Sequence, residues 1–334
     1  WGYGNFLIDE KSLESFKEGL SLIKEDLLRE LIYSTITKMV TDGRAPAHLF
    51  FDIIRNHIAK ESNLNIVSTM LTSYVPSFLS YYVPKENYRE EADKMFDFLL
   101  NDFLPKTEGE EIKQHIISAI LSVASGNEHL KILQGWLEDK KPFAIVDGKK
   151  VSINADININ NKHRILKKIS TSIKLNTNEF QEFVESELAE DSKDQDLVNR
   201  CKLSIEAAEY DIDVKNNFLD ELLAPKCERS IWDQRAIAST LLPSSQAALV
   251  KPLIDRFFNE IPLVFKNRLR DERDAIYASI KPTQFASPEL LQKYKDTVEA
   301  LNEEEQKSLI AKMNEDIESL EKILAGQKLY ADTI

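Results

Sequence analysis

Apolar residues recur along most of this chain at intervals of three and four positions, a pattern that predicts amphipathic α-helices. Residues 230–264 give the clearest example. Ser230 is a favourable N-cap with Asp233 at the third helical position, and apolar residues follow at helical spacing until Pro243. A second apolar stripe follows and closes at Pro262. We interpret this stretch as two antiparallel helices that bury one face against each other and need further helices to cover the rest.

The same periodicity continues on both sides of this stretch. Residues 13–40 carry an apolar stripe that ends at Asp42-Gly43, and Pro76 is expected to kink a later helix. Residues 112–124 are apolar on nearly every side, which predicts a helix buried in the middle of the array. A last helix, capped by Asn302, has a narrow apolar seam and a charged back, typical of a helix on the outside. The pattern predicts an all-α fold: an irregular α-solenoid of stacked antiparallel helix pairs, a HEAT- or armadillo-like bowl.

Two segments depart from the helical pattern. Residues 1–8 are aromatic-rich and alternating, which favours a strand-like lead-in before the first helix. Further along, Asp147-Gly148 lies between two short alternating runs and predicts a small β-hairpin. We therefore expect the end of a preceding domain at 1–12 and a helical domain at 13–334, with lobes at 13–141 and 158–334 and the hairpin at 142–157 between them.

The charge balance narrows the range of partners. The chain holds 43 Lys and Arg against 56 Asp and Glu, a formal net charge of -13, and it has no Lys/Arg block that could follow a phosphate backbone. These features argue against nucleic acid and anionic membranes as partners. No uncharged apolar run reaches the roughly 18 residues of a membrane span. With two cysteines, Cys201 and Cys227, and no N-x-[ST] sequon, the sequence favours a reducing, cytoplasmic location.

The residue patterns of catalysis and metal binding are missing from the sequence. None of the five histidines lies within four residues of another, so no H-E-x-x-H pair is present to hold zinc. The cysteines are not in a C-x-x-C motif, and there is no G-x-S-x-G motif or glycine-rich phosphate loop. The run from Asp271 to Asp274 has mixed charges and is typical of a solvated helix start. We expect no catalytic residue, metal ligand or cofactor in this chain on its own.

Several stretches nevertheless resemble a known family. The segment YGNFLIDEKSL, from Tyr3 to Leu13, resembles the junction in aminopeptidase N-type zinc metallopeptidases of the bacterial-type branch at which the last strand before the C-terminal region leads into its first helix. VKNNFLDELL at 214–223, then QRAIAS and LVKPLIDRFFNEIP, resemble later helices of that region in order and spacing. Phe218 stands where the family pattern has tryptophan. The resemblance covers essentially the whole chain and rests on helical motifs, not on a catalytic signature.

The resemblance implies a specific role. Such enzymes carry their H-E-x-x-H and G-x-M-E-N motifs in a separate thermolysin-like domain, and neither motif is present here. The chain is then the non-catalytic C-terminal domain of a zinc aminopeptidase, which caps the active site and encloses the peptide substrate. Zinc belongs to the parent enzyme, the implied partners are peptides and the catalytic domain of the same parent chain, and the chain alone should be inactive. The alternative is a free-standing helical-repeat scaffold that binds protein partners on its concave face.

A peptide-enclosing domain needs a group that recognises the peptide's distal carboxylate. In an acidic chain a helix-borne arginine fits this task, since its planar guanidinium group, with its forked N–H donors, holds a carboxylate through two hydrogen bonds. Arg235 is the first candidate, because it follows Gln234 in the most family-like helix and lies beside an apolar stripe. Arg256 and Lys215 are the second choices. Arg235 could instead pair with a nearby surface carboxylate.

Overall fold

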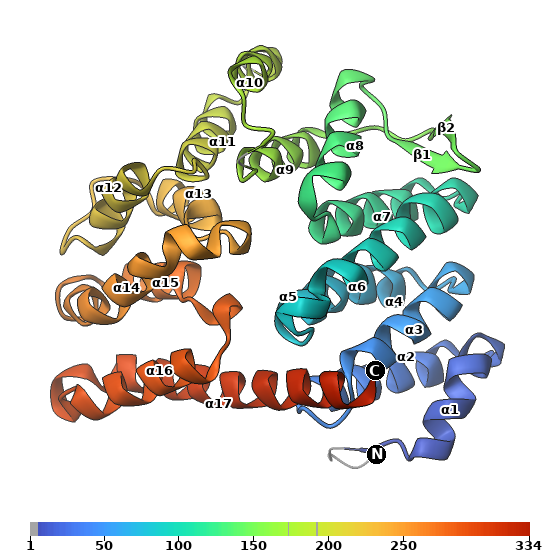
Figure 1. Cartoon of the computed structure of the whole chain (residues 1–334), viewed down its shortest axis with the longest axis horizontal. Helices are drawn as coiled ribbons and strands as arrows, with labels where there is room; N and C mark the ends of the chain where they lie inside the picture. Colours follow the sequence, from blue (N-terminus) through green and yellow to red (C-terminus); the bar gives the residue numbers. More distant parts are fainter. Residues whose placement is uncertain (1–5, 173, 192) are drawn as a thin grey trace. The chain divides into compact units, whose positions relative to one another are not determined.

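The computed structural model describes residues 6–172, 174–191 and 193–334, and it confirms an all-α fold with a small two-stranded hairpin. Figure 1 shows the elements in chain order. The chain divides into two compact units. Unit 1 contains the described residues up to Asn161 together with Glu321–Ile334, and unit 2 contains Lys162–Leu320. Unit 1 gives way to unit 2 shortly after the hairpin, which was the boundary expected between two lobes. The sequence did not indicate that the C-terminal residues belong to unit 1.

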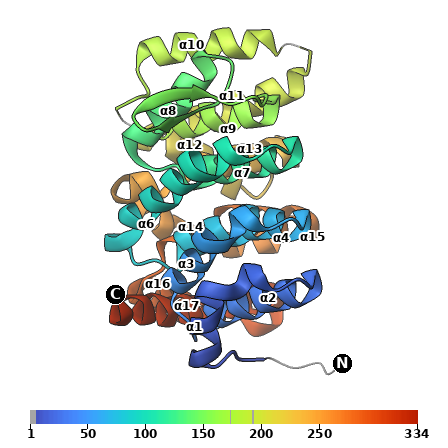
Figure 2. The same cartoon turned by 90° about the vertical axis from the view of Figure 1, so that its right-hand side faces the viewer.

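Unit 1 is a stack of helices with the hairpin near its end, and short 3₁₀ and π turns are labelled η. Its elements are α1 (Glu10–Gly19), η1 (Leu20–Leu22), α2 (Asp26–Thr41), α3 (Ala47–His57), η2 (Ile58–Lys60), α4 (Leu64–Thr69), η3 (Met70–Tyr74), α5 (Val75–Tyr81), α6 (Lys85–Asp97), η4 (Phe98–Phe103), η5 (Leu104–Lys106), α7 (Glu110–Val123), α8 (Gly126–Glu138), β1 (Phe143–Val146) and β2 (Lys149–Ser152). Figure 2 shows these helices layered from α1 and α2, through α3 and α4, to α7 and α8.

The apolar stripe over residues 13–40 is interrupted in the structure. The chain leaves α1 at Gly19, passes through η1, and starts α2 at Asp26. Arg29 fixes this loop, because its Nη1 donates to the carbonyl oxygens of Ile23 at 2.8 Å and Lys24 at 3.1 Å. The loop between α1 and α2 is therefore held by a side chain from the helix that follows it.

One expectation for the middle of unit 1 is confirmed, and another stays a prediction. The π turn η3 ends two residues before Pro76, and α4, η3 and α5 follow one another without a gap, so the kink expected at Pro76 stays a prediction. The apolar segment 112–124 lies in α7, whose Ile116, Ile117 and Ile120 have no exposed surface. Helix α7 contacts α4, α5 and α6 at once, which explains why its apolar residues face several directions.

The predicted hairpin is also confirmed. Strands β1 and β2 pair antiparallel, with Val146 opposite Lys149. Asp147 and Gly148 form the turn with φ of +50° and +72°, the left-handed backbone that a two-residue hairpin of this kind requires. The strand-like lead-in expected for residues 1–8 lies mostly outside the described residues, and residues 6–9 are in no regular element.

Unit 2 is a second helical stack, which Figure 1 shows running from α10 to α16. Its elements are α9 (Ile159–Ser170), which starts in unit 1, α10 (Asn178–Glu190), α11 (Gln195–Ala207), α12 (Ile212–Leu223), α13 (Ile231–Leu241), η6 (Ser244–Gln246), α14 (Ala247–Asn267), α15 (Arg270–Ile280), η7 (Thr283–Phe285), α16 (Pro288–Ala300) and α17 (Glu303–Thr333), which ends in unit 1.

The helices of unit 2 form two layers. Helices α11, α13 and α15 contact one another in sequence, and α12, α14 and α16 form the other layer. Cross-layer contacts join α12 to α13 and α14 to α15. The predicted pairing of α13 with α14 is therefore wrong, although both helices exist. Periodicity identifies the apolar face of a helix but not the neighbour that covers it.

The boundaries of α13 and α14 agree with the sequence in part. Ser230 caps α13, since its Oγ accepts the amide N–H of Asp233 at 3.2 Å. Pro262 does not end α14, which continues to Asn267. Ile261 and Val264, on either side of the proline, are fully buried, so packing on both sides maintains the helix through a residue that lacks an amide donor.

The final turns of α17 pack on unit 1. Gln327 Nε2 donates to the carbonyl oxygen of Tyr81 at 2.8 Å, and the Tyr330 hydroxyl donates to Glu91 Oε2 at 3.3 Å. A Cβ at Gly326 would approach the Tyr82 ring to 2.7 Å, so glycine permits this close contact. The C-terminal segment is thus an integral part of the unit 1 core.

Candidate functional site

Lys215 of α12 is a structural residue in this arrangement. Its side chain has no exposed surface, and Nζ donates to the carbonyl oxygens of Ala207 at 2.8 Å and Leu241 at 3.0 Å. These carbonyls end α11 and α13, where the helix dipoles favour a cation. Burial lowers the pKa of Lys215 to about 8. The ammonium group therefore joins two helix ends and is not presented to a ligand.

Arg256 of α14 is already paired. Its guanidinium donates to Glu260 Oε1 at 2.7 Å, to Asp220 Oδ1 at 2.6 Å and to Asn216 Oδ1 at 2.9 Å. Hydrogen bonding to Glu260, followed by that to Asp220, raises the pKa of Arg256. This side chain links α14 to α12, and a peptide carboxylate would have to displace those carboxylates to reach it.

Arg235 of α13 has a different environment. It is exposed, and its guanidinium carbon lies 5.1 Å from the ring centroid of Trp232, one helical turn earlier. The indole is itself 56% exposed, and no ion pair or hydrogen bond of the Arg235 side chain is found in the described part of the chain. In the described residues Arg235 therefore does not pair with a surface carboxylate, which was the alternative role for this side chain. Stacking on the indole orients the fork and leaves its N–H edges facing solvent.

Trp232 was missed in the sequence interpretation. It lies outside the apolar stripe of α13, which suggested a residue of no special role. Two features of the sequence could have identified Trp232. It lies three residues before Arg235, on the same side of the helix, and a large aromatic residue is uncommon on a polar helix face. Lys215 is buried and Arg256 is bound by carboxylates, while Arg235 is exposed, so the three candidates do not present their charges together to one ligand.

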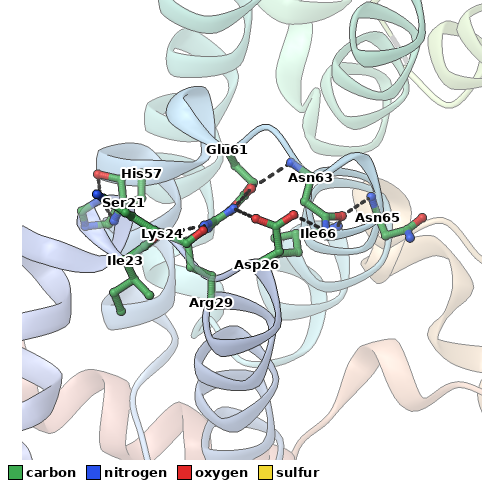
Figure 3. Close-up of polar contacts among 10 residues, drawn as sticks. All are labelled: Ser21, Ile23, Lys24, Asp26, Arg29, His57, Glu61, Asn63, Asn65 and Ile66. Carbon is green, nitrogen blue, oxygen red and sulfur yellow. Dashed lines mark hydrogen bonds and ion pairs between the residues drawn. The ribbon is translucent and has the colours of Figure 1, made fainter.

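A second feature, in unit 1, is a cavity of about 260 Å³ beside the loop between α1 and α2. One wall is the Arg29–Glu61 ion pair, in which Nε and Nη2 donate to the carboxylate at 2.7 Å each. Asp26 accepts another Nη2 hydrogen bond at 2.8 Å. Figure 3 shows the Arg29 guanidinium held among these carboxylates and the loop carbonyls. Hydrogen bonding to Glu61 raises the pKa of Arg29, and all five N–H groups of the fork are engaged.

His57 forms another wall of the cavity. Its Nε2 lies 2.8 Å from the carbonyl oxygen of Lys17, which identifies Nε2 as the protonated nitrogen. Nδ1 then accepts the backbone N–H of Ser21 at 3.4 Å, and the Ser21 Oγ lies 3.1 Å from it (Figure 3). The ring is 3% exposed, and a backbone carbonyl occupies the place of the carboxylate found in a Ser-His-Asp triad. This contact connects α3 to α1 and the loop and does not define a nucleophile.

A larger hollow, of about 820 Å³, lies along α10 and α11 in unit 2. Four glutamates and one lysine are among its lining residues: Glu182, Glu185, Glu206, Glu209 and Lys202. Lys202 pairs with Glu185 at 2.8 Å, and burial raises the pKa of Glu209. The excess negative charge makes this hollow an unsuitable place for a peptide carboxylate.

Unit 1 also exposes apolar side chains at its N-terminal helices. Leu27, Leu28 and Leu31 on α2 are 55%, 46% and 44% exposed, and Leu22 in η1 is 80% exposed. Single exposed leucines are common on protein surfaces, but three on adjacent positions of one helix make an apolar face.

The described part of the chain contains no assembled metal site. Among residues 6–172, 174–191 and 193–334, no three or more His, Cys, Asp or Glu side chains gather so that they could hold a metal ion. In the same residues, no helix is sufficiently long and apolar to cross a membrane. Cys201 is buried and Cys227 is partly exposed, and neither forms a disulfide.

Comparison of the chain with models of protein families and with curated protein sequences finds no match.

Proposed function

We propose that this chain is the non-catalytic, helical C-terminal domain of a zinc aminopeptidase, where it encloses the peptide and contacts the end distal to the cleaved bond. The proposal rests on the sequence resemblance of residues 3–13 and 214–223 and on one feature of the fold. That feature is Arg235, an exposed guanidinium stacked on Trp232 without a carboxylate partner in the described residues.

The chemistry of this pair suits a peptide C-terminus. A carboxylate approaching the edge of the Arg235 fork can accept two parallel hydrogen bonds, while the indole beneath contacts the last side chain of the peptide. Lysine would give neither the planar fork nor the stacking, so the arrangement depends on arginine. The remaining candidates, Arg256 and Lys215, support the helices that carry this pair.

The apolar face of α2 supports the second partner in this proposal, the catalytic domain of the same parent chain. Leu27, Leu28 and Leu31 follow closely after the stretch that resembles the family junction, where contact with a preceding domain is expected. Domain interfaces of this kind have an apolar core, which exposed leucines would provide. Peptide-cleaving activity and its zinc would belong to that other domain.

Kinetics of the longer parent protein test the proposal. Arg235→Ala should raise KM for long peptides by roughly three- to thirtyfold, the equivalent of about 0.7 to 2 kcal/mol of lost binding, and leave a single-residue reporter substrate unaffected. Arg270→Ala is the matched control, since Arg270 is an exposed arginine on the neighbouring helix α15. Equal losses on long and short substrates, or none on either, would refute the assignment.

The second candidate function is a free-standing helical scaffold that binds protein partners. An exposed Trp-Arg pair is also common at the centre of protein interfaces, so the same observation supports this function. A parent reading frame with H-E-x-x-H upstream supports the aminopeptidase, and a native start near residue 1 supports the scaffold.

A further inference from the structure

The cavity in unit 1 contains a hydrogen-bonding group that the protein itself does not satisfy. Tyr33 of α2 lines the cavity and is 1% exposed, and its hydroxyl has no hydrogen-bond partner in the described residues. Burial raises the pKa of Tyr33, so the hydroxyl keeps its proton and remains a donor. Since no side chain or backbone group of the described residues accepts this hydrogen bond, the hydroxyl can donate to a ligand that brings an acceptor into the cavity.

The charged residues around the cavity determine whether it favours an anionic or a cationic ligand. The lining has three cationic side chains and one carboxylate. Arg29 pairs with Glu61 and also with Asp26, which is outside the lining, and the guanidinium has no donor left. Lys24 and Lys60 remain, both exposed and without an ion pair in the part of the chain that the structure describes. The cavity therefore carries an excess of positive charge, in a chain whose formal net charge is -13.

The other lining groups add polar contacts but no negative charge. Ser62 contributes a hydroxyl, while Ser21 and His57 are joined to each other as described above. Leu20 and Ile23 supply a small apolar portion. A volume of about 260 Å³ is below the range of about 300–1,000 Å³ typical of drug-sized ligands, so a nucleotide or a peptide segment is too large.

We propose that this cavity binds a small anion with carboxylate or phosphate oxygens. One oxygen accepts the Tyr33 hydroxyl hydrogen bond, and the ammonium groups of Lys24 and Lys60 balance the charge. The site belongs to unit 1 and is independent of the Arg235 proposal, which concerns unit 2.

Calorimetric titration of the whole chain with inorganic phosphate, succinate and the uncharged analogue succinamide tests this inference. We expect phosphate or succinate to bind at or below about 10 mM, more weakly as salt rises, and succinamide not to bind. The preferred anion identifies whether phosphate or carboxylate oxygens fit. Equal binding of succinamide, or no binding of either anion at about 10 mM, would overturn the proposal.

Two variants locate the binding. Tyr33→Phe deletes one hydroxyl and should weaken binding about 5- to 30-fold. Lys24→Gln/Lys60→Gln changes exposed residues that do not support the fold, and it should weaken binding at least as much and reduce its salt dependence. Lys106→Gln, at an exposed lysine of η5, is the control that should bind as the parent does. Unchanged affinity in both variants would show that the anion binds elsewhere and contradict the assignment.

Discussion

Arg29 and Glu61, 32 residues apart in the chain, form an ion pair with two N–H···O hydrogen bonds of 2.7 Å. The side chains are only 9% and 2% exposed. Glu61 Oε1 also accepts the backbone N–H of Asn63 at 2.8 Å, and Arg29 holds the loop carbonyls before α2. This pair therefore connects the loop between α1 and α2 to the start of α4, and it forms the wall of the proposed anion cavity.

Removing one partner of this pair should be costly. Arg29→Met leaves the Glu61 carboxylate buried without its counter-charge and frees the loop carbonyls, so we expect the free energy of unfolding to fall by about 3–5 kcal/mol. Urea denaturation followed by circular dichroism measures this loss. Arg270→Met, on an exposed arginine, should change stability by no more than about 0.5 kcal/mol. A loss below about 1 kcal/mol in Arg29→Met would contradict the structural role of the pair.

Much of the fold could be predicted from the sequence, because apolar periodicity, caps and turn residues act locally. The N-caps Ser230, Ser287 and Asn302 accept the amides expected of them, and Asp147-Gly148 forms the expected turn. The neighbours of each helix could not be predicted, since any apolar face can be covered by several partners. The pairing of α13 with α14 was wrong for this reason.

The candidate sites were predicted less completely. Arg235 lies on a helix and is exposed, and its role in binding a peptide stays a prediction. Lys215 was selected by charge alone, and its burial follows from tertiary packing. The cavity in unit 1 arises where the helical stripe breaks after Gly19, and nothing in the periodicity marks that break. Tyr33 lies in α2 and Glu61 in the loop between η2 and α4, so their proximity depends on the fold.

Lys215 should make stability depend on pH in the alkaline range. Its pKa falls from 10.5 in the unfolded chain to about 8 in the folded protein, mainly because of burial. Between these values the unfolded state binds more protons, so stability rises with pH. The cost of the buried charge is fully present below pH 8 and is lost as the pH approaches 10.5.

Comparison with Lys215→Met isolates this effect from other alkaline titrations. Unfolding free energies at several pH values should show the parent gaining about 1–3 kcal/mol relative to the variant across that window. Parallel curves for the two proteins would show that Lys215 keeps the same proton affinity on folding.

The two cysteines should differ in reactivity. Cys201 on α11 is 3% exposed, and burial raises its thiol pKa to about 12, whereas Cys227 is partly exposed. The thiolate is the reactive form, so a disulfide reagent at mildly alkaline pH should modify Cys227 first and Cys201 at least about tenfold more slowly. Cys227→Ser should remove the fast phase. A fast phase that persists in this variant would place Cys201 at an accessible surface.

Stacking on Trp232 should contribute to the orientation of Arg235. Trp232→Ala removes the cation–π contact, worth roughly 0.5–1 kcal/mol at an exposed site, and frees the guanidinium. We expect a two- to fivefold loss of affinity for carboxylate-terminated peptides in Trp232→Ala, and a smaller loss in Trp232→Phe, which keeps an aromatic face. Loss of the same size in both variants would argue that the indole contacts the peptide directly instead of orienting the arginine.

The most direct test of the account is a binding measurement on this chain with one peptide in two forms, a free C-terminal carboxylate and its C-terminal amide. Isothermal titration calorimetry measures both affinities, and Arg270→Ala, at an exposed arginine, serves as the control. The account predicts that the free carboxylate binds three- to thirtyfold more tightly than the amide, and that Arg235→Ala removes this preference without weakening binding of the amide. Equal affinity of the two peptides for the parent chain, or a preference that survives Arg235→Ala, would contradict it.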